Sequence, residues 1–296
     1  MDYAKVNYFD NYVVLEGVKN FNIKQIAECG QCFRWKKVQE LHYIGVAYEK
    51  VIEVIQRDDN VTILNTSKDD FNNIWVHYFD LSRDYESIKK KLSDDPILKE
   101  SVEYGYGIRI LNQEPFEILF SFIISARNSI PVISKTIEKI SKKYGEEIEY
   151  KGQKYYTFPS PKKLEGVTEE DIKETGASFR SKYIVDTINK IVHNPDYTYN
   201  LDYISKLGDD ECHTELQKFK GVGSKVADCI MLFSMKKTSA FPVDVWVKRA
   251  MIYFYGAEDA SLNKIRIFAR NKFKELSGFA QQYLFYNARE NKIKID

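Results

Sequence analysis

The chain contains the stretch Leu216-Gln-Lys-Phe-Lys-Gly-Val-Gly-Ser-Lys-Val-Ala-Asp-Cys-Ile-Met-Leu-Phe-Ser-Met235. This pattern predicts a helix, a turn at Gly221-Val-Gly223 and a second helix that begins at Ser224. Because glycine has no side chain, the turn and the start of the second helix expose backbone N–H groups that a phosphate can approach. Glycine after a helix is also an ordinary C-terminal cap. Taken alone, the turn therefore fits both a helix-hairpin-helix phosphate clamp and a simple cap.

Lys225 and Asp244 are the two residues of this region that can carry chemistry. A helix over 224–235 would be about 18 Å long, and the segment 236–243 can span about 27 Å when extended, so the chain can return and place Asp244 beside Lys225. A lysine amine can attack an acetal carbon and form a Schiff base, while a carboxylate stabilises the developing cation. The simpler alternatives are a solvated lysine and an N-terminal cap at Asp244 for a helix over 245–255.

Basic residues dominate around this stretch, although the whole chain has a net charge of only +1. Between residues 216 and 252, only Asp228 and Asp244 oppose the cations Lys218, Lys220, Lys225, Lys236, Lys237, Lys248 and Arg249. A polyanionic partner would therefore bind to a local patch and not to a global basic field.

The sequence changes from strand-like to helix-like periodicity near Tyr85. Alternating apolar and polar residues predict strands over 12–15, 32–38, 42–47, 51–56 and 61–65. Farther along, Pro115 and Pro131 mark the starts of helices over 116–126 and 130–144. We therefore expect an α+β protein, in which an N-terminal twisted antiparallel β-sheet domain precedes two α-helical domains.

The same periodicities suggest where the domains divide. We expect the sheet domain over residues 1–108, one helical domain over 128–224, and a second helical domain formed by 109–127 together with 225–296. The helix-hairpin-helix motif, at about residues 213–235, then lies at the junction of the two helical domains. Because no Gly/Ser-rich linker or repeat is present, the domains are expected to pack against one another.

Composition limits the classes of protein that fit. With 44% hydrophobic and 29% charged residues, the chain has the composition of a water-soluble globular protein. The longest nearly apolar stretch, 118–126, is too short for a bilayer, and the start has no apolar signal core, so we expect a cytoplasmic protein with no membrane partner. Cys29-Gly-Gln-Cys32 has the spacing of a redox pair or half a zinc site, but no second Cys or His pair accompanies it. We therefore expect no metal site and no cofactor.

The residues quoted above, with Pro242-Val-Asp244, resemble the 8-oxoguanine DNA glycosylases of the helix-hairpin-helix superfamily. Further segments resemble the family in the same order: Gly30-Gln-Cys-Phe-Arg-Trp35, Glu114-Pro-Phe-Glu117, Phe179-Arg-Ser-Lys-Tyr183 and Gly278-Phe-Ala-Gln-Gln-Tyr-Leu-Phe285. The resemblance thus runs from residue 30 to residue 289. It implies a bifunctional enzyme that flips 8-oxoguanine out of double-stranded DNA, cleaves the N-glycosidic bond and then nicks the strand by β-elimination.

The resemblance implies roles for the catalytic and damaged-base-binding residues. Lys225 would be the nucleophile that forms the Schiff base, and Asp244 would steady the charged sugar while it caps its helix. The Gly30 carbonyl would accept the hydrogen on N7 that 8-oxoguanine has and guanine lacks. Gln281 and Phe285, spaced i and i+4 on one helix face, would read the Watson–Crick edge and stack on the base. The family places the cysteine matching Cys229 on the opposite face of the base.

The resemblance also implies a set of DNA contacts. Phe179 would wedge into the vacated stack and Arg180 would contact the orphaned base. The remaining DNA-binding positions are Gly221, Gly223 and Ser224 at the hairpin, Arg127 and Asn128 in the turn before the 130–144 helix, and Trp246 two residues beyond the carboxylate. The sequence does not decide whether a cation bridges the hairpin to a DNA phosphate. The protein is expected to act as a monomer.

Two positions depart from the family pattern. The arginine that reads the opposite cytosine is replaced by Val132, which has no hydrogen-bond donor, so we expect a relaxed preference for the opposite base. Trp246 stands where the animal enzymes have His, which puts a phosphate contact there in question. The alternatives to the main hypothesis are a helix-hairpin-helix glycosylase for another damaged base and a DNA-binding protein without catalysis.

Overall fold

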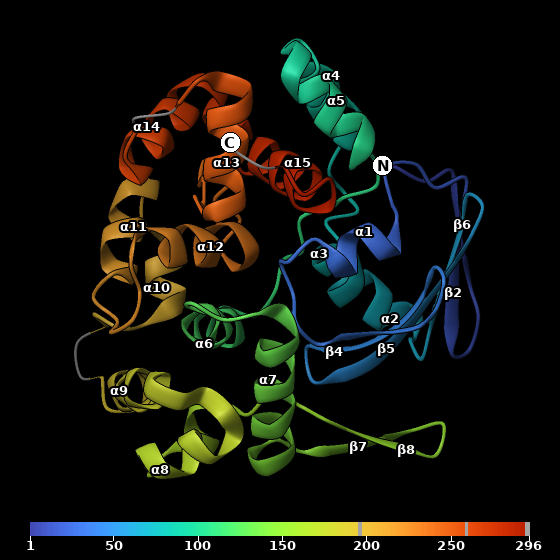
Figure 1. Cartoon of the computed structure of the whole chain (residues 1–296). Coiled ribbons are helices and arrows are strands. Elements are labelled where there is room, and N and C mark those ends of the chain that lie inside the picture. Colours follow the sequence, from blue (N-terminus) through green and yellow to red (C-terminus); the bar gives the residue numbers. More distant parts are fainter. Residues whose placement is uncertain (195–196, 258–259, 294–296) are drawn as a thin grey trace.

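A six-stranded antiparallel sheet forms the N-terminal part of the chain in this computed structural model, which describes residues 1–194, 197–257 and 260–293 (Figure 1). The strand order is β1-β2-β6-β5-β4-β3. The strands are β1 (Lys5–Tyr8), β2 (Tyr12–Glu16), β3 (Trp35–Gln39), β4 (His42–Ala47), β5 (Lys50–Arg57) and β6 (Asn60–Leu64). The five predicted strands are confirmed, although the one expected over 32–38 begins only at Trp35. Edge strand β1 was not predicted, because none of its residues is fully buried.

Short helices pack against the sheet and close its core. Ile23 and Ile26 of the first helix lie in one buried cluster with Val13, Val54 and Ile63 of the strands. The helical segments are α1 (Ile23–Glu28), α2 (Lys68–Asp70), η1 (Phe71–Trp75) and α3 (Val76–Tyr78). These segments precede the change to helical periodicity near Tyr85 and were not predicted. These segments are one or two turns long, too short to establish a helical period in the sequence.

Helices make up most of the remaining chain (Figure 1). They are α4 (Tyr85–Leu92), α5 (Pro96–Tyr104), α6 (Pro115–Ser125), α7 (Ile130–Tyr144), η2 (Pro161–Leu164), α8 (Glu169–Ile172), η3 (Lys173–Ala177), η4 (Ser178–Arg180), α9 (Ser181–Val192), α10 (Leu201–Lys206), α11 (Asp209–Leu216), α12 (Ser224–Ser234), α13 (Val245–Tyr255), α14 (Leu262–Phe273), η5 (Lys274–Leu276) and α15 (Ser277–Glu290). The α+β class is confirmed. Within the described ranges, no helix has the length and apolarity to cross a membrane.

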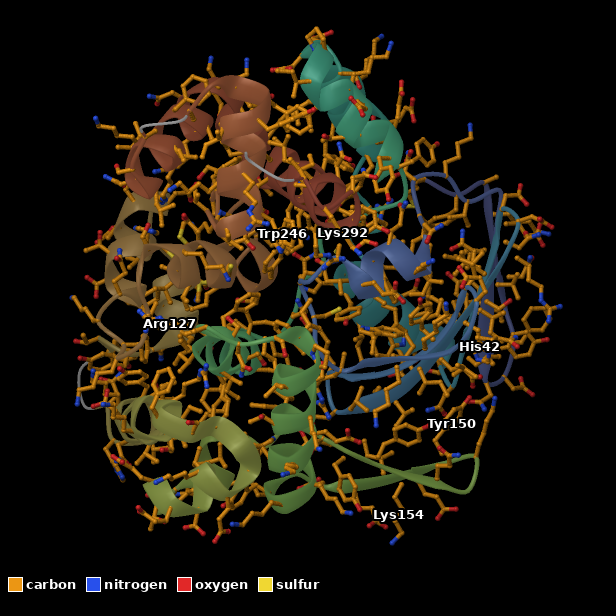
Figure 2. The ribbon with its side chains drawn as sticks, in the orientation of Figure 1. His42, Arg127, Tyr150, Lys154, Trp246 and Lys292 are labelled. Atoms are coloured by element: carbon orange, nitrogen blue, oxygen red, sulfur yellow. The ribbon has the colours of Figure 1, made fainter. Side chains whose placement is uncertain are left out.

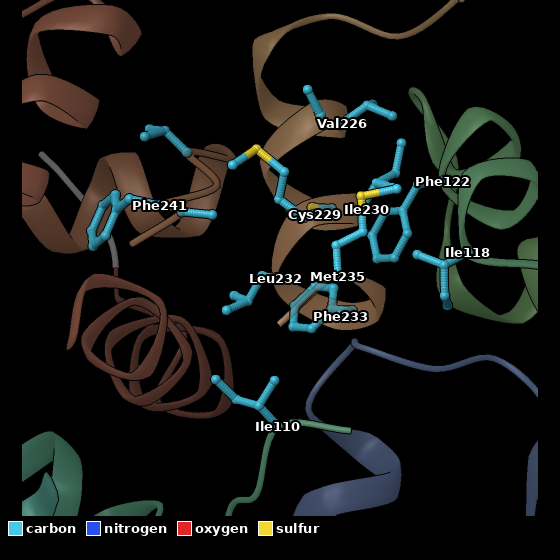
Figure 3. Packing of buried hydrophobic residues seen from close by; sticks show 14 of the residues in the cluster. Ile110, Ile118, Phe122, Val226, Cys229, Ile230, Leu232, Phe233, Met235 and Phe241 are labelled. Atoms are coloured by element: carbon cyan, nitrogen blue, oxygen red, sulfur yellow. The ribbon is translucent and has the colours of Figure 1, made fainter. Parts of the chain in front are cut away.

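A single large hydrophobic cluster joins all parts of the helical region. Figure 3 shows α12 residues Cys229, Ile230 and Phe233 packed opposite Phe122 of α6, whose ring stacks on that of Phe233 with centroids 5.6 Å apart. Helices α4 and α5 belong to this cluster and not to the sheet core: the ring of Tyr85 meets that of Phe279 in α15 at 5.5 Å. The domain boundaries given above stay a prediction, and the packing places residues 85–104 with the helices.

A two-stranded hairpin, β7 (Glu147–Tyr150) and β8 (Gln153–Tyr156), reaches from the end of α7 to the sheet (Figure 1). Its anchor is the buried carboxylate of Glu53, which accepts hydrogen bonds from Tyr150 (2.6 Å), Lys151 (2.6 Å) and His42 (2.6 Å). Figure 2 labels two of these donors, Tyr150 on the hairpin and His42 on the sheet. These bonds hold the pKa of Glu53 below its ordinary value although burial opposes this. The hairpin, which was not predicted, thereby ties α7 to the sheet.

Candidate functional site

A cavity of about 440 Å³ lies where the sheet region meets the helices. Its walls come from the turn at Gly30, from α6 and the loop that follows it, from the first turns of α12 and α13, and from α15. Nine of the predicted site residues line it: Gly30, Arg127, Asn128, Lys225, Cys229, Asp244, Trp246, Gln281 and Phe285. Segments that are separated by as much as 250 residues in the sequence therefore meet at one concave site, the usual form of a ligand-binding site.

Lys225 lies in the first turn of α12, directly after the hairpin. Gly223 is the N-cap residue of this helix, so the lysine side chain starts beside the exposed helix terminus. The side chain is half-buried, and its Nζ lies 5.1 Å from the centroid of the Phe122 ring. Within the described part of the chain, Lys225 forms no ion pair. Its amine therefore faces the cavity without a carboxylate held against it.

Asp244 caps α13 and lines the same cavity. Its Oδ1 accepts a hydrogen bond from the Val247 N–H (2.8 Å), as expected of an N-cap residue. Burial raises the pKa of the carboxyl above its ordinary value, against the opposing effects of this hydrogen bond and of the Lys225 ammonium. The extended loop after α12 thus returns the carboxylate to the same cavity as the amine, as the length argument predicted.

The turn at Gly30 approaches α15 closely. Gly30 has a φ of +81°, a conformation that side-chain-bearing residues rarely adopt, and a Cβ at this position would lie 3.1 Å from the Phe285 ring. The amide Oε1 of Gln281, one helical turn before Phe285, is buried in the cavity wall and has no hydrogen-bond partner among the described residues. A buried acceptor without a partner is costly unless a ligand supplies a donor.

Cys229 also lines the cavity, one helical turn after Lys225 on α12. Burial raises the pKa of its thiol to about 11, so the sulfur is a neutral apolar surface near pH 7. The cysteines of the Cys29-x-x-Cys32 segment are also buried, and both thiols lie against the carbonyl oxygen of Ile26. Burial raises the pKa of the Cys29 thiol to about 12. These sulfurs are therefore inert packing groups in this structure.

The hairpin lies outside the cavity and exposes its backbone. Gly221, Gly223 and Ser224 are all exposed. His213 of α11 donates a hydrogen bond from Nε2 to the Ser224 carbonyl (3.2 Å), and its Nδ1 accepts one from Gln217 (3.1 Å). Burial lowers the pKa of this histidine, which agrees with a neutral ring. His213 of α11 therefore holds the start of α12 in place, a role that its sequence context did not indicate.

The two hairpin glycines allow a matched test of the phosphate contact. A Cβ at Gly223 would meet no atom within 4 Å, whereas one at Gly221, where φ is +83°, would lie 2.9 Å from the Tyr183 ring. We expect Gly223→Ala to leave the unfolding free energy nearly unchanged but to weaken duplex DNA binding by about tenfold, because the methyl group blocks close approach of a phosphate. We expect Gly221→Ala to lower the unfolding free energy by about 1 kcal/mol or more. Fluorescence anisotropy with a duplex and urea unfolding measure these effects, and unchanged affinity of Gly223→Ala would contradict the contact.

The loop between α6 and α7 carries Arg127 and Asn128. Arg127 is exposed with a φ of +52°, and the Asn128 amide donates to the Ile124 carbonyl (3.2 Å). Arg180 is buried beneath this loop: its guanidinium donates to the carbonyl oxygens of Ala126 (2.9 Å) and Arg127 (3.1 Å). In this structure backbone carbonyls accept the hydrogen bonds of the Arg180 guanidinium, and its contact with an orphaned base stays a prediction. Arg180 supports the loop that carries Arg127.

Phe179 and Trp246 are the two aromatic residues predicted to contact DNA. Phe179 is 49% exposed, so its ring is available to a partner. Trp246 is half-buried at the cavity edge, where the guanidinium of Arg249 lies 4.8 Å from its ring. Figure 2 shows Trp246 on α13 and Arg127 beyond the end of α6, so the two residues reach the cavity from different elements.

Arg289 is a cavity residue that the sequence analysis missed. It follows Gln281 and Phe285 at the same i, i+4 spacing, so continuing that helix face by one more turn would have identified it. Its guanidinium lies 5.1 Å from the Phe285 ring and donates to the carbonyl oxygen of Glu28 (2.6 Å).

Comparisons with known proteins agree with this geometry. The family model described as "8-oxoguanine DNA glycosylase, N-terminal domain" matches residues 13–119, and the model described as "HhH-GPD superfamily base excision DNA repair protein" matches residues 120–275. A probable N-glycosylase/DNA lyase of Methanothermobacter thermautotrophicus is 32% identical over 73% of this chain and 74% of its own length. The N-glycosylase/DNA lyase OGG1 of Arabidopsis thaliana is 32% identical over 86% of this chain and 74% of its own length.

A solved structure is similar over almost the whole chain. The 8-oxoguanine glycosylase/lyase of Clostridium acetobutylicum, in complex with double-stranded DNA containing cytosine opposite 8-oxoguanine, is 56% identical, with a TM-score of 0.96. The match covers 99% of this chain and 100% of that one. The two family models follow one another along the chain, and the matched proteins cover most of it. The cavity that holds Lys225 and Asp244 beside the helix-hairpin-helix agrees with the same assignment. The chain belongs to the 8-oxoguanine DNA glycosylase family of the HhH-GPD superfamily.

Proposed function

We propose that this protein is a bifunctional DNA glycosylase and AP lyase that excises 8-oxoguanine from double-stranded DNA. The observation that carries the proposal is the single cavity that holds a lysine amine, a carboxylate and an unpartnered amide oxygen, from Lys225, Asp244 and Gln281. Its volume of about 440 Å³ accommodates one extruded nucleotide and not a duplex. The target base must therefore leave the helical stack before it can react.

Excision begins when the Lys225 ammonium gives up a proton and its amine attacks C1′ of the extruded nucleotide. The C1′–N9 bond breaks, its electron pair leaves with the base, and the base takes up the proton that the attacking nitrogen loses on bonding to C1′. Positive charge develops on the sugar as the bond breaks, and the Asp244 carboxylate stabilises it across the same cavity. Opening of the sugar ring then leaves an iminium, the Schiff base between Lys225 and C1′.

Strand cleavage follows from the Schiff base. The iminium makes the C2′ hydrogen acidic, so its loss to a base and departure of the 3′ phosphate form a C2′–C3′ double bond and break the strand. Hydrolysis of the imine then releases the Lys225 amine for another turnover. This β-elimination explains why one amine supports both activities.

The walls of the cavity supply base selection. The Gly30 carbonyl accepts the N7 hydrogen of 8-oxoguanine, which guanine does not have. The buried Oε1 of Gln281 supports the assignment of a Watson–Crick-edge contact, because guanine presents N–H donors there. Phe285 and the neutral thiol of Cys229 stand on opposite sides of the base.

The DNA outside the cavity meets residues from several elements. The exposed hairpin backbone at Gly221, Gly223 and Ser224 binds phosphate. The exposed Phe179 ring fills the gap that the extruded nucleotide leaves in the base stack. Arg127, Asn128 and Trp246 line the cavity and border the path of that nucleotide. The partner is double-stranded DNA that contains an oxidised purine, bound by one copy of the protein. The cytoplasmic location remains a prediction.

Opposite-base preference tests the role of Val132. This residue is 46% exposed in the first turn of α7 and carries no donor. We expect single-turnover excision rates opposite cytosine, adenine, guanine and thymine to agree within about fivefold, because each good bidentate base contact is worth about 1–3 kcal/mol of discrimination and none is made here. Val132→Arg is expected to introduce a preference for cytosine. A steep cytosine preference of the wild-type protein would contradict this prediction.

The decisive experiment measures excision from duplexes that contain 8-oxoguanine, a thymine glycol, an alkylated purine or no lesion. Release of 8-oxoguanine and a borohydride-trapped covalent complex support the proposal. Release of a different base would assign the protein to another branch, and tight binding without release or trapping would leave a DNA-binding protein without catalysis.

A further inference from the structure

The turn at residues 28–31, here called the recognition turn, is held from two sides. On one side Gln31 binds the segment 109–113: its Oε1 accepts from the Leu111 N–H (2.8 Å) and its carbonyl accepts from Gln113 (2.9 Å). On the other side α15 provides two bonds, from Gln282 to the Cys29 sulfur (3.4 Å) and from Arg289 to the Glu28 carbonyl (2.6 Å). Gly30 lies between these two attachments.

Arg289 contacts both walls that enclose the base site. Its Nη2 binds the recognition turn, while its guanidinium carbon lies over the Phe285 ring, 5.1 Å from the centroid. The side chain is only 16% exposed, and Nη2 also forms an ion pair with Glu290 (2.8 Å), to which Nε donates a hydrogen bond (3.0 Å). The third nitrogen, Nη1, is buried without a partner and would be 3.4 Å from a Cβ on Gly30.

These contacts set the distance between the turn and the ring. Because Gly30 has no side chain, its backbone can adopt a positive φ and is less restricted than that of other residues. A planar guanidinium that binds a carbonyl with one nitrogen and stacks on a ring fixes both groups in one geometry. A lysine could supply the donor but not the flat surface.

We propose that Arg289 is a positioning residue of the damaged-base site, which holds the recognition turn and the Phe285 ring at the separation that 8-oxoguanine requires. This inference rests on the proposed function. Arg289 acts through the Gly30 carbonyl and the Phe285 ring, so its loss affects the step in which a base occupies the cavity. It does not affect attack of the amine on a sugar that has already lost its base.

The test compares two reactions of the same protein. Arg289→Met is expected to lower the single-turnover rate of 8-oxoguanine excision by about 10- to 100-fold, because small displacements of positioning groups cost this much. Cleavage of a preformed abasic site, which requires Lys225 but no base, is expected to stay within about threefold of wild type. Arg289→Lys, which keeps a donor for the Glu28 carbonyl, should recover part of the excision rate.

A matched control is available in Arg83, which lies just before α4 and contacts the same helix, α15. Arg83 lies over the Phe279 ring of α15, 5.6 Å from its centroid, and pairs with Asp80, but it does not line the cavity. Arg83→Met should therefore leave the ratio of the two reactions unchanged. Thermal unfolding of each variant reports any general loss of stability.

Each outcome decides the inference. Unchanged excision in Arg289→Met, an equal loss of excision and abasic-site cleavage, or no recovery in Arg289→Lys overturns it. If the wild-type protein itself leaves 8-oxoguanine in place, the proposed function fails and the inference fails with it. An active wild type with an equally active Arg289→Met variant removes the inference alone.

Discussion

Replacing Lys225 by glutamine is expected to abolish borohydride trapping and to lower 8-oxoguanine excision by at least about a thousandfold, because no other described residue that lines the cavity carries a primary amine. Glutamine keeps most of the side-chain volume over the Phe122 ring, so the wall of the cavity is preserved. Single-turnover excision and covalent trapping measure the loss. Duplex affinity should change by only a few-fold, because the hairpin that contacts phosphate is untouched.

Lys272 provides the control for this substitution. It also lies over an aromatic ring, 5.5 Å from the centroid of Tyr255, but it is paired with Asp95 on a surface remote from the cavity. Lys272→Gln should retain trapping and excision. A Lys225→Gln protein that still forms a trapped complex would show that another amine is the nucleophile.

We expect Asp244→Asn to lower the single-turnover excision rate by about 100- to 1,000-fold, because the negative charge that stabilises the developing cation is removed. Asparagine caps helices about as well as aspartate, so the bond from the Val247 N–H is kept while the negative charge is removed. The unfolding free energy should therefore change little, whereas Asp244→Ala should also lose about 1 kcal/mol from the missing cap. Wild-type excision by the Asn variant would rule out an electrostatic role.

The pH profile gives an independent check of Asp244. The ionised carboxylate is the active form, and burial raises the pKa of this group above its ordinary 3.8. As the pH falls through that raised pKa, the charge is lost and the excision rate falls, so the acid limb should lie above pH 3.8. In Asp244→Asn this group no longer titrates. We therefore expect the fall in rate on the acid side to become shallower, and an identical limb in both proteins would contradict the assignment.

Sequence periodicity predicted the long helices but not the short elements. The expected ranges 130–144 and 245–255 agree with α7 and α13, because each begins with a clear signal, at Pro131 or Asp244, and has a sustained helical pattern. The β7–β8 hairpin and α1 are too short to show a hydrophobic periodicity in the sequence. Their conformation depends on tertiary contacts that no local rule contains: the hairpin is held by the buried Glu53 carboxylate, and the Ile23 N–H of α1 donates to Gln56 Oε1 (3.0 Å).

The site shows the same division between local and long-range information. Lys225 and Asp244 could be paired from the length of the loop between them. Gly30 is nearly 200 residues away from Lys225, so only a family resemblance could bring it to the same cavity. Arg180 illustrates the limit of such a transfer, because a motif names the residue but not the carbonyl groups of Ala126 and Arg127 that occupy its donors. No motif pointed to Arg289, although its i, i+4 spacing from Phe285 would have identified it.

Apart from Cys229, the base-reading groups of the cavity lie far along the chain from the bond-breaking pair. Lys225 and Asp244 lie within 20 residues of each other, whereas Gly30, Gln281 and Phe285 belong to distant segments. Substitutions in the outer segments can thus alter which lesions are accepted while the reactive pair stays intact. Relatives with this fold can therefore excise a broader or narrower range of damaged bases while they keep the same lysine and carboxylate.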